Sequence, residues 1–133
     1  MSAAHALMHA LHAALRADVG VGAILGDRIH DRVPERTTFP YATYGALSSR
    51  ELDAEALEEH ALTVEVWSRL RGRSEALLAA EAIRLALARD GIVMDGHRLV
   101  SLRTQEVAAP KGSSRGDAER VVLALRAVTE PED

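Results

Sequence analysis

Three histidines near the start of the chain have the residue type and spacing that metal chemistry requires. His5, His9 and His12 are separated by four and three positions, so on a helix they lie on one side. Two histidines at positions i and i+4 can share a zinc ion. However, no acidic residue stands among them to complete the ligand set, and Arg16 extends the same stripe and would repel a cation. We therefore expect a polar or inter-subunit stripe and no metal site.

Motifs for other kinds of chemistry are missing from the sequence. The chain has no cysteine, which excludes disulfides, thiolate zinc sites and cysteine nucleophiles. The glycine-rich run at 20–26 follows a predicted helix and has no P-loop lysine, and no Gly-x-Ser-x-Gly elbow occurs. An acid and a base stand side by side at 58–60, but adjacent side chains rarely converge on one substrate. We predict no catalytic residue, no cofactor and no enzymatic activity.

The charge balance narrows the class of partner. The formal net charge is −4, whereas a free-standing nucleic-acid-binding domain usually carries a basic excess. No apolar run approaches the roughly 20 residues that cross a bilayer, and no basic segment followed by an apolar one marks a signal peptide. The sequence thus predicts a soluble chain without membrane contact.

Hydrophobic periodicity and turn residues predict the elements that position these side chains. Helical spacing covers 3–16, Ser74 is expected to cap a helix that runs to about residue 89, and Asp18 is a plausible N-cap for a short helix at 19–25. Residues 28–33 look extended. Strand-like stretches are 41–47, 61–70, 98–107 and 119–128, and Asp95-Gly96 is a hairpin-turn signal. The first helix carries an apolar stripe and an alanine-rich face with almost no charge, which is typical of a helix covered on more than one side.

This order of elements predicts an α+β fold in a single domain over residues 1–133. We expect an about four-stranded, mainly antiparallel sheet with helices packed on one face. Residues 130–133 are expected to be a loose tail. Two long connections are predicted to be flexible, an acidic one at 48–60 with a helical turn at 53–59 and a Gly/Ser-rich one at 108–117.

The charged residues of these two connections are the candidate assembly contacts. One interpretation is that they only keep the chain soluble. The other is that they mate with other subunits, since complementary charges set register and encounter rate. Trp67, on a predicted strand, is a packing or interface residue. The candidate interface residues are Glu51, Asp53, Glu55, Glu58 and Glu59 on the acidic side, Lys111 and Arg115 on the basic side, and Trp67.

Several short motifs, taken in order, resemble a known family. They are Ile29–Pro34 (IHDRVP), Phe39–Gly45 (FPYATYG), Leu62–Arg69 (LTVEVWSR) and Gly96–Leu102 (GHRLVSL), preceded by the Ala/Leu-rich helix that ends near Asp18. Together they resemble the DUF3168 family of tail completion proteins, which includes tail terminators of siphophages and of gene transfer agents. The similarity runs from about residue 3 to 129.

The resemblance implies a structural role with no catalytic residue to carry over. Such proteins form a homo-hexameric ring that caps the tail tube protein, stops its polymerisation and meets a head-side stopper or connector. DNA then transits the lumen without specific binding. The implied location is the cytoplasm during assembly and afterwards the head–tail junction of a phage-like particle. The ring contact is expected on a sheet edge or on the alanine-rich first helix.

Three alternatives follow from the same residues. A head-completion or stopper protein would act at the same junction, and particles lacking it would have full heads that leak DNA, whereas loss of a terminator gives over-long or headless tails. A small ligand-binding α+β domain would need a pocket with convergent polar groups. A nucleic-acid binder is disfavoured by the net charge.

Overall fold

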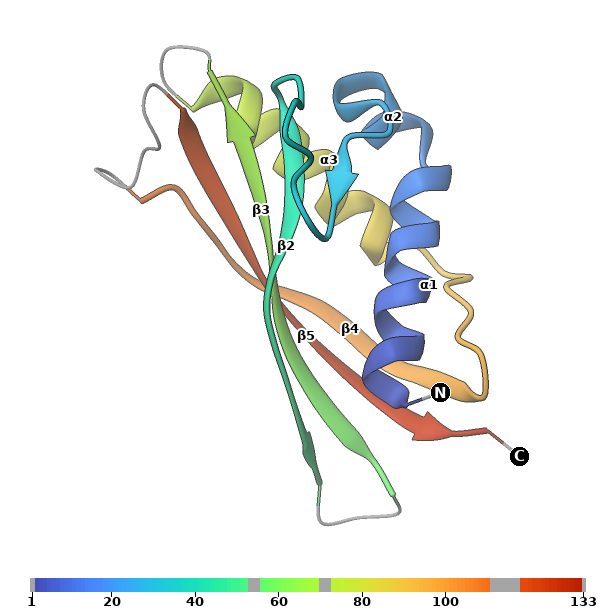
Figure 1. Cartoon of the computed structure of the whole chain (residues 1–133). Helices are drawn as coiled ribbons and strands as arrows, with labels where there is room; N and C mark the ends of the chain where they lie inside the picture. The colour runs from blue at the N-terminus through green and yellow to red at the C-terminus, as the bar shows by residue number, and fades with distance from the viewer. Residues whose placement is uncertain (1, 53–55, 70–72, 111–117, 133) are drawn as a thin grey trace.

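Three helices lie against one face of a five-stranded sheet in the computed structural model of the chain (Figure 1). The structure describes residues 2–52, 56–69, 73–110 and 118–132. In chain order the elements are α1 (Ala3–Ala17), α2 (Val19–Leu25), β1 (Ile29–His30), β2 (Tyr41–Glu51), β3 (Glu58–Ser68), α3 (Ser74–Ala88), β4 (His97–Ala108) and β5 (Glu119–Pro131). The predicted α+β class with helices on one face is confirmed.

The sheet has the strand order β1-β2-β3-β5-β4. Its four long strands are antiparallel to their neighbours, while the two-residue β1 is parallel to β2 and pairs only with Ala42 and Thr43. The prediction of about four mainly antiparallel strands therefore holds, with β1 as a short addition. β5 is an interior strand although it comes last in the chain, because it pairs with both β3 and β4.

Alternation along the strands separates a helix-facing side of the sheet from an opposite side. On β3 the residues Leu62, Val64 and Val66 are buried, as the sequence predicts, while the residues between them are only partly buried apart from Trp67. Those three, with Val121, Leu123, Leu125 and Ala127 of β5, join the apolar residues of the helices in one core. We call the opposite side, which carries the odd-numbered residues of β3 and the even-numbered residues of β5, the outer face.

The apolar residues of α1 are buried in the chain's own core. Ser2 caps it by accepting a hydrogen bond from the His5 backbone amide at 3.1 Å. Leu7, Leu11 and Leu15 are fully buried, and most of the alanine-rich face is buried with them. Asp18 then caps α2 and pairs with Arg89 at the end of α3, which ties the helices together. The small residues of α1 thus allow close packing within the subunit.

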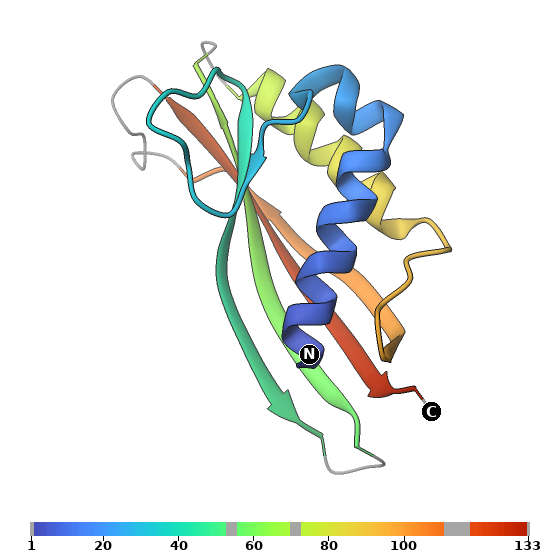
Figure 2. The ribbon, with the colours of Figure 1, turned by 45° about the vertical axis from the view of Figure 1, so that its right-hand side comes forward.

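The acidic connection is largely not a loop. β2 continues to Glu51 and β3 begins at Glu58, so 48–51 and 58–60 form a ribbon that projects beyond the helices (Figure 2). The prediction of a helical turn at 53–59 is wrong for residues 58 and 59, because both pair with residues of β2 in the sheet. In this ribbon, polar and apolar residues do not alternate as they do in a strand with one buried face. The reason is that most of its side chains are exposed to solvent, so neither face requires apolar residues.

Two smaller predictions are also corrected. Asp95-Gly96 is not a hairpin turn between consecutive strands, since the element before it is α3; Gly96, with φ of 73°, instead turns the chain into β4. The expected loose tail is wrong for its first two residues. β5 runs to Pro131, and Glu130 forms an ion pair with Arg98 of β4.

Candidate assembly surfaces

The sheet ends in two strand edges that have no partner strand among the described residues. Because β1 reaches only Ala42 and Thr43, the edge of β2 is open from Tyr44 to Glu51. β4 is the opposite edge, and only β5 pairs with it. Leu47 on the first edge and Val100 and Val107 on the second are each 40–44% exposed. Long edges with exposed apolar side chains are templates for pairing with another chain.

The projecting ribbon is held to the rest of the sheet by a fully buried histidine. The His60 ring lies between two hydroxyls, with Nδ1 2.6 Å from the Ser49 Oγ and Nε2 2.9 Å from the Thr129 Oγ1. These contacts join β2, β3 and β5 on the helix-facing side. Burial lowers the pKa of His60, although the nearby Glu58 acts in the opposite direction. The ring is therefore neutral at neutral pH.

This arrangement predicts that stability falls as the solution is acidified. A histidine whose folded pKa lies below its unfolded value near 6.5 binds its proton more readily in the unfolded chain, so stability is fully present above that value and is lost as pH falls. Urea unfolding at a series of pH values between about 5 and 8 should show this loss. A His60→Gln variant, which keeps hydrogen-bonding capacity, should show a smaller loss. An equal pH dependence in both proteins would contradict the assignment to His60.

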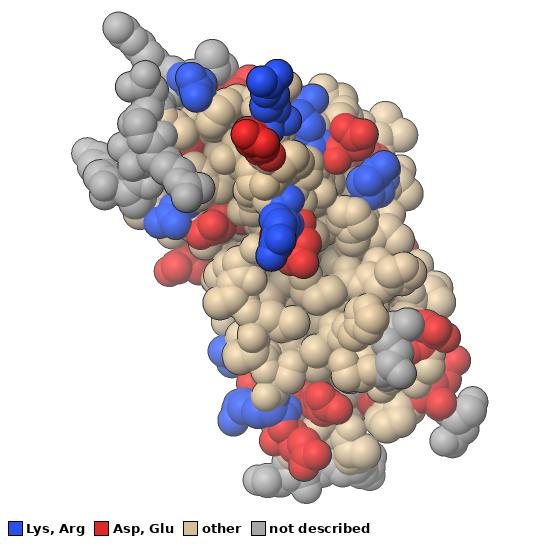
Figure 3. Space-filling model, viewed as in Figure 1, with Lys and Arg blue, Asp and Glu red and all other residues tan. Residues whose placement is uncertain are grey.

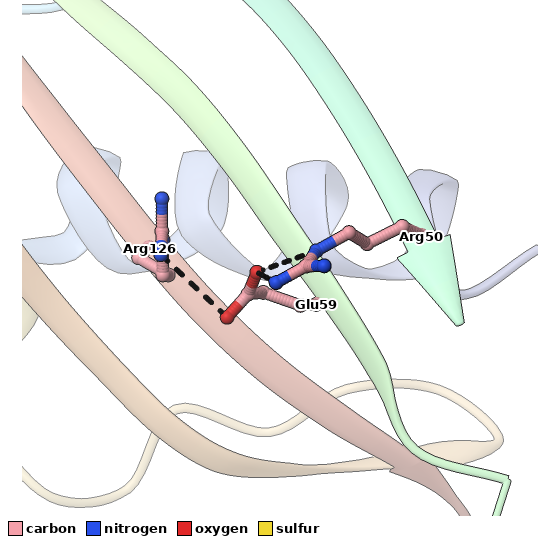
Figure 4. A network of polar contacts seen from close by, with 3 residues as sticks. All are labelled: Arg50, Glu59 and Arg126. Carbon is pink, nitrogen blue, oxygen red and sulfur yellow. Dashed lines mark hydrogen bonds and ion pairs between the residues drawn. The ribbon is translucent and has the colours of Figure 1, made fainter. Parts of the chain in front are cut away.

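Arginine–glutamate pairs cross the outer face. Glu59 of β3 accepts a hydrogen bond from Arg50 of β2 at 2.9 Å, and its other oxygen lies 3.8 Å from Arg126 of β5 (Figure 4). The hydrogen bond from Arg50, and secondarily the charge of Arg126, lower the pKa of Glu59. In Figure 4 a helix lies behind the strands, on the side away from these three residues. The carboxylate thus bridges two cations from two strands.

The outer face carries a small aromatic cluster around Trp67. Its indole Nε1 donates to the Thr43 Oγ1 at 3.3 Å, and its ring stacks against Tyr41 with centroids 6.4 Å apart. Arg120 lies over the ring at 5.5 Å and pairs with Glu65 at 2.9 Å. Only 9% of Trp67 is exposed, so its first role is packing within the subunit.

The predicted charged contacts are only partly described. Glu51, Glu58 and Glu59 lie on the ribbon, and Figure 3 shows acidic side chains gathered at that end of the molecule. On the side of the molecule that Figure 3 shows, a broad area without charged side chains lies between the two charged ends. Asp53, Glu55, Lys111 and Arg115, together with most of the predicted 108–117 loop, lie outside the described residues. Residue 108 itself ends β4.

The histidine stripe of α1 borders a groove of about 720 Å³ between that helix, β1 and β2. His5, His9, His12 and His30 line it. The His12 Nδ1 lies 2.8 Å from the Tyr44 hydroxyl, and burial, followed by the charge of Arg16, lowers its pKa. Within the described ranges, no group of three His, Cys, Asp or Glu residues is arranged to hold a metal ion.

No helix in the described part of the chain combines the length and apolar character needed to cross a membrane.

Comparison with known proteins gives two findings. The family model described as tail completion protein gp17 matches residues 9–130. A chain in the structure of the virion of a native gene transfer agent particle superimposes with a TM-score of 0.83 at 28% identity, covering 98% of this chain and 99% of that chain. A comparison with curated protein sequences found no match.

Proposed function

Because the chain belongs to the tail completion protein gp17 family, a family of tail structural proteins, we propose that it is the tail terminator of a phage-like particle. In this role it caps the finished tail tube, stops tube polymerisation and presents a surface to the head-side connector. The observation that carries the proposal is the match over nearly its full length to a chain of a gene transfer agent virion. The role needs no catalytic residue, and the protein acts as a structural component.

The two open sheet edges support a ring as the working form. β2 and β5 run in one direction while β3 and β4 run in the other, because all four are antiparallel to their neighbours. If β4 of one copy lies beside the open part of β2 of the next copy, these two strands are also antiparallel, and the alternation of strand direction continues from one copy to the next. Such a contact is heterologous, and repeated by rotation it closes a ring. Backbone hydrogen bonds across the edge supply the contact without a specific side-chain pair.

The size of such a ring indicates which face of the sheet lines the lumen. Six copies, the number implied by the family, would form a wall of about 24 long strands, roughly 37 Å across at a spacing of ~4.8 Å. A helix layer about 10 Å thick on the inner wall would close most of that space. The helices therefore belong on the outside, and the outer face of each sheet faces the lumen.

The first helix is a poorer candidate for the ring contact. Its leucines and three of its seven alanines, Ala3, Ala6 and Ala10, are already buried within the subunit. Of the two expected locations, the sheet edges are therefore the better candidate for the ring contact. Glu51, Glu58 and the aromatic cluster around Trp67 remain proposed contacts with neighbouring proteins, as do the charged residues outside the described ranges. These neighbours are the tail tube protein on one side and the head-side connector on the other.

Electron microscopy of purified particles tests this location directly. The protein should be found as a ring at the head-proximal end of the tail tube, between the tube and the connector. A position within the head shell, along the tube or at the distal tip would refute the terminator role. A stopper occupies the same junction on the head side, so the layer in contact with the last tube ring distinguishes the two.

A further inference from the structure

The outer face carries a nearly balanced set of charges from four strands. By their register, the cations on this face are Arg50, Arg98, Arg103, Arg120 and Arg126, and the acids are Glu59, Glu65, Glu106 and Glu130. Among the described residues, four of the five arginines have a glutamate partner on the same face. The pairs link β2 to β3, β3 to β5 and β4 to β5.

Two glutamates hold three exposed arginines of this face, whereas Arg103 is exposed and has no glutamate partner among the described residues. Arg50, Arg98 and Arg126 are 69%, 61% and 44% exposed at their side chains. Glu59 contacts the first and third, and Glu130 pairs with Arg98. By contrast, Arg120 is only 25% exposed and lies over Trp67. Without the two glutamates, three guanidinium groups on one surface would be free to contact phosphates.

Exposed ion pairs add little to stability, so stability alone is a weak reason for them. Unpaired arginines would, however, attract a polyanion such as DNA. Each phosphate contact releases counterions and contributes to binding that is independent of DNA sequence. Duplex DNA moving along a wall of unpaired arginines would be retained by it. Pairing three of the exposed arginines with carboxylates reduces this attraction while the strands stay linked.

We propose that Glu59 and Glu130 neutralise the arginines of the outer face so that duplex DNA passes this surface without binding to it. The proposal rests on the ring function above, because that function turns the outer face toward the lumen. The proposed neutralisation also determines how strongly the isolated chain binds DNA, and that binding can be measured without the particle.

The first experiment measures DNA binding by the purified full chain. The variant is Glu59→Gln/Glu130→Gln, in which glutamine keeps the shape and hydrogen-bonding capacity of the side chain. The probe is a fluorescently labelled duplex without sequence preference, followed by anisotropy. The matched control is Glu81→Gln/Asp90→Asn, which changes the net charge equally but lies on α3 and the segment after it, where Glu81 pairs with Arg84.

We expect the wild type and the control not to bind at about 50 mM salt, and the outer-face variant to bind at least ~10-fold more tightly. With three phosphate contacts, its affinity should fall roughly 40-fold between about 50 and 200 mM salt. Adding Arg50→Gln and Arg126→Gln to the variant should remove most of the binding. The proposal is overturned if the outer-face variant binds no more tightly than the control, or if the wild type already binds as tightly.

A second measurement separates this proposal from the terminator role. Particles assembled with the outer-face variant should have tails of normal length but deliver less DNA, because the glutamates act on transit and not on capping. Normal delivery from such particles would overturn the proposal and leave the terminator role intact. If the double variant does not fold, Glu59→Gln alone, which frees Arg50 and Arg126, is measured in the same way.

Discussion

Replacing Val100 and Val107 by lysine should give a folded protein that no longer stops tail growth. Both side chains lie on the open edge of β4 and are more than two fifths exposed, so the substitutions cost the subunit little stability. Lysine on an edge strand opposes pairing with a further strand, because the incoming chain would have to desolvate the ammonium group. The ring contact between β4 and the next copy's β2 would then be lost.

The expected phenotype is a change from tails of one length to a broad distribution of longer tails, measured by electron microscopy of particles from cells that make only the variant. Each hydrogen bond lost across the edge contributes about 0.5–1.5 kcal/mol, and a ring loses them at every contact. Leu47→Lys on the open edge of β2 should have the same effect alone, since the contact is heterologous and needs both surfaces.

The matched control is Leu77→Lys/Leu78→Lys on α3, whose side chains are 45% and 63% exposed, because it adds the same two charges away from both edges. It should leave tail length unchanged. Tails of normal length from the Val100/Val107 variant would refute the edge contact. Normal tails attached to heads that leak DNA would favour a stopper over a terminator.

The largest loss of stability is expected for Leu123→Ala. Leu123 is fully buried in β5, an interior strand, and belongs to the core between the sheet and the helices. Truncating a buried leucine removes its transfer free energy and leaves a cavity, at a cost of about 2–5 kcal/mol. That is a large share of the roughly 5–15 kcal/mol by which domains are stable. The free energy of unfolding should be measured by urea denaturation.

Leu85→Ala serves as the comparison, because Leu85 has the same side chain on α3 but is 48% exposed. Its effect should stay within about 0.5 kcal/mol. A loss below about 1 kcal/mol for Leu123→Ala would mean that the packing around β5 relaxes more than its burial indicates. It would also weaken the view that β5 organises the sheet.

Regular periodicity predicted the elements that pack against the core. The short helix at 19–25 has the observed bounds, and the helix predicted at 3–16 differs from α1 by one residue. The prediction that Ser74 caps the third helix is wrong, because Ser74 is its first helical residue and Arg73 at the N-cap makes no side-chain hydrogen bond; the helix ends at Ala88, one residue before the predicted end. Periodicity predicts the elements for a physical reason: a helix or strand that buries one face must repeat its apolar residues at the period of the element. The alternation of Leu62, Val64 and Val66 indicated the buried side of β3 in the same way.

The strand ends at 48–51 and 58–60 could not be predicted by that signal. The ribbon projects beyond the helices, so most of its side chains meet solvent on both faces and the sequence reads as an acidic loop. Its strands are recognised only when the cross-strand pairs are seen, such as Arg50 with Glu59, and when the buried His60 finds its hydroxyl partners from two other strands.

The sequence by itself determined the α+β class, the helices and the buried faces of β3 and β5, because local periodicity reports burial. It also pointed to the family through the order of its motifs. Only the tertiary structure decided that β5 inserts between β3 and β4, which edges stay open and which arginines meet which glutamates. Those features depend on contacts between residues far apart in the chain, and no local pattern encodes the order in which strands pair.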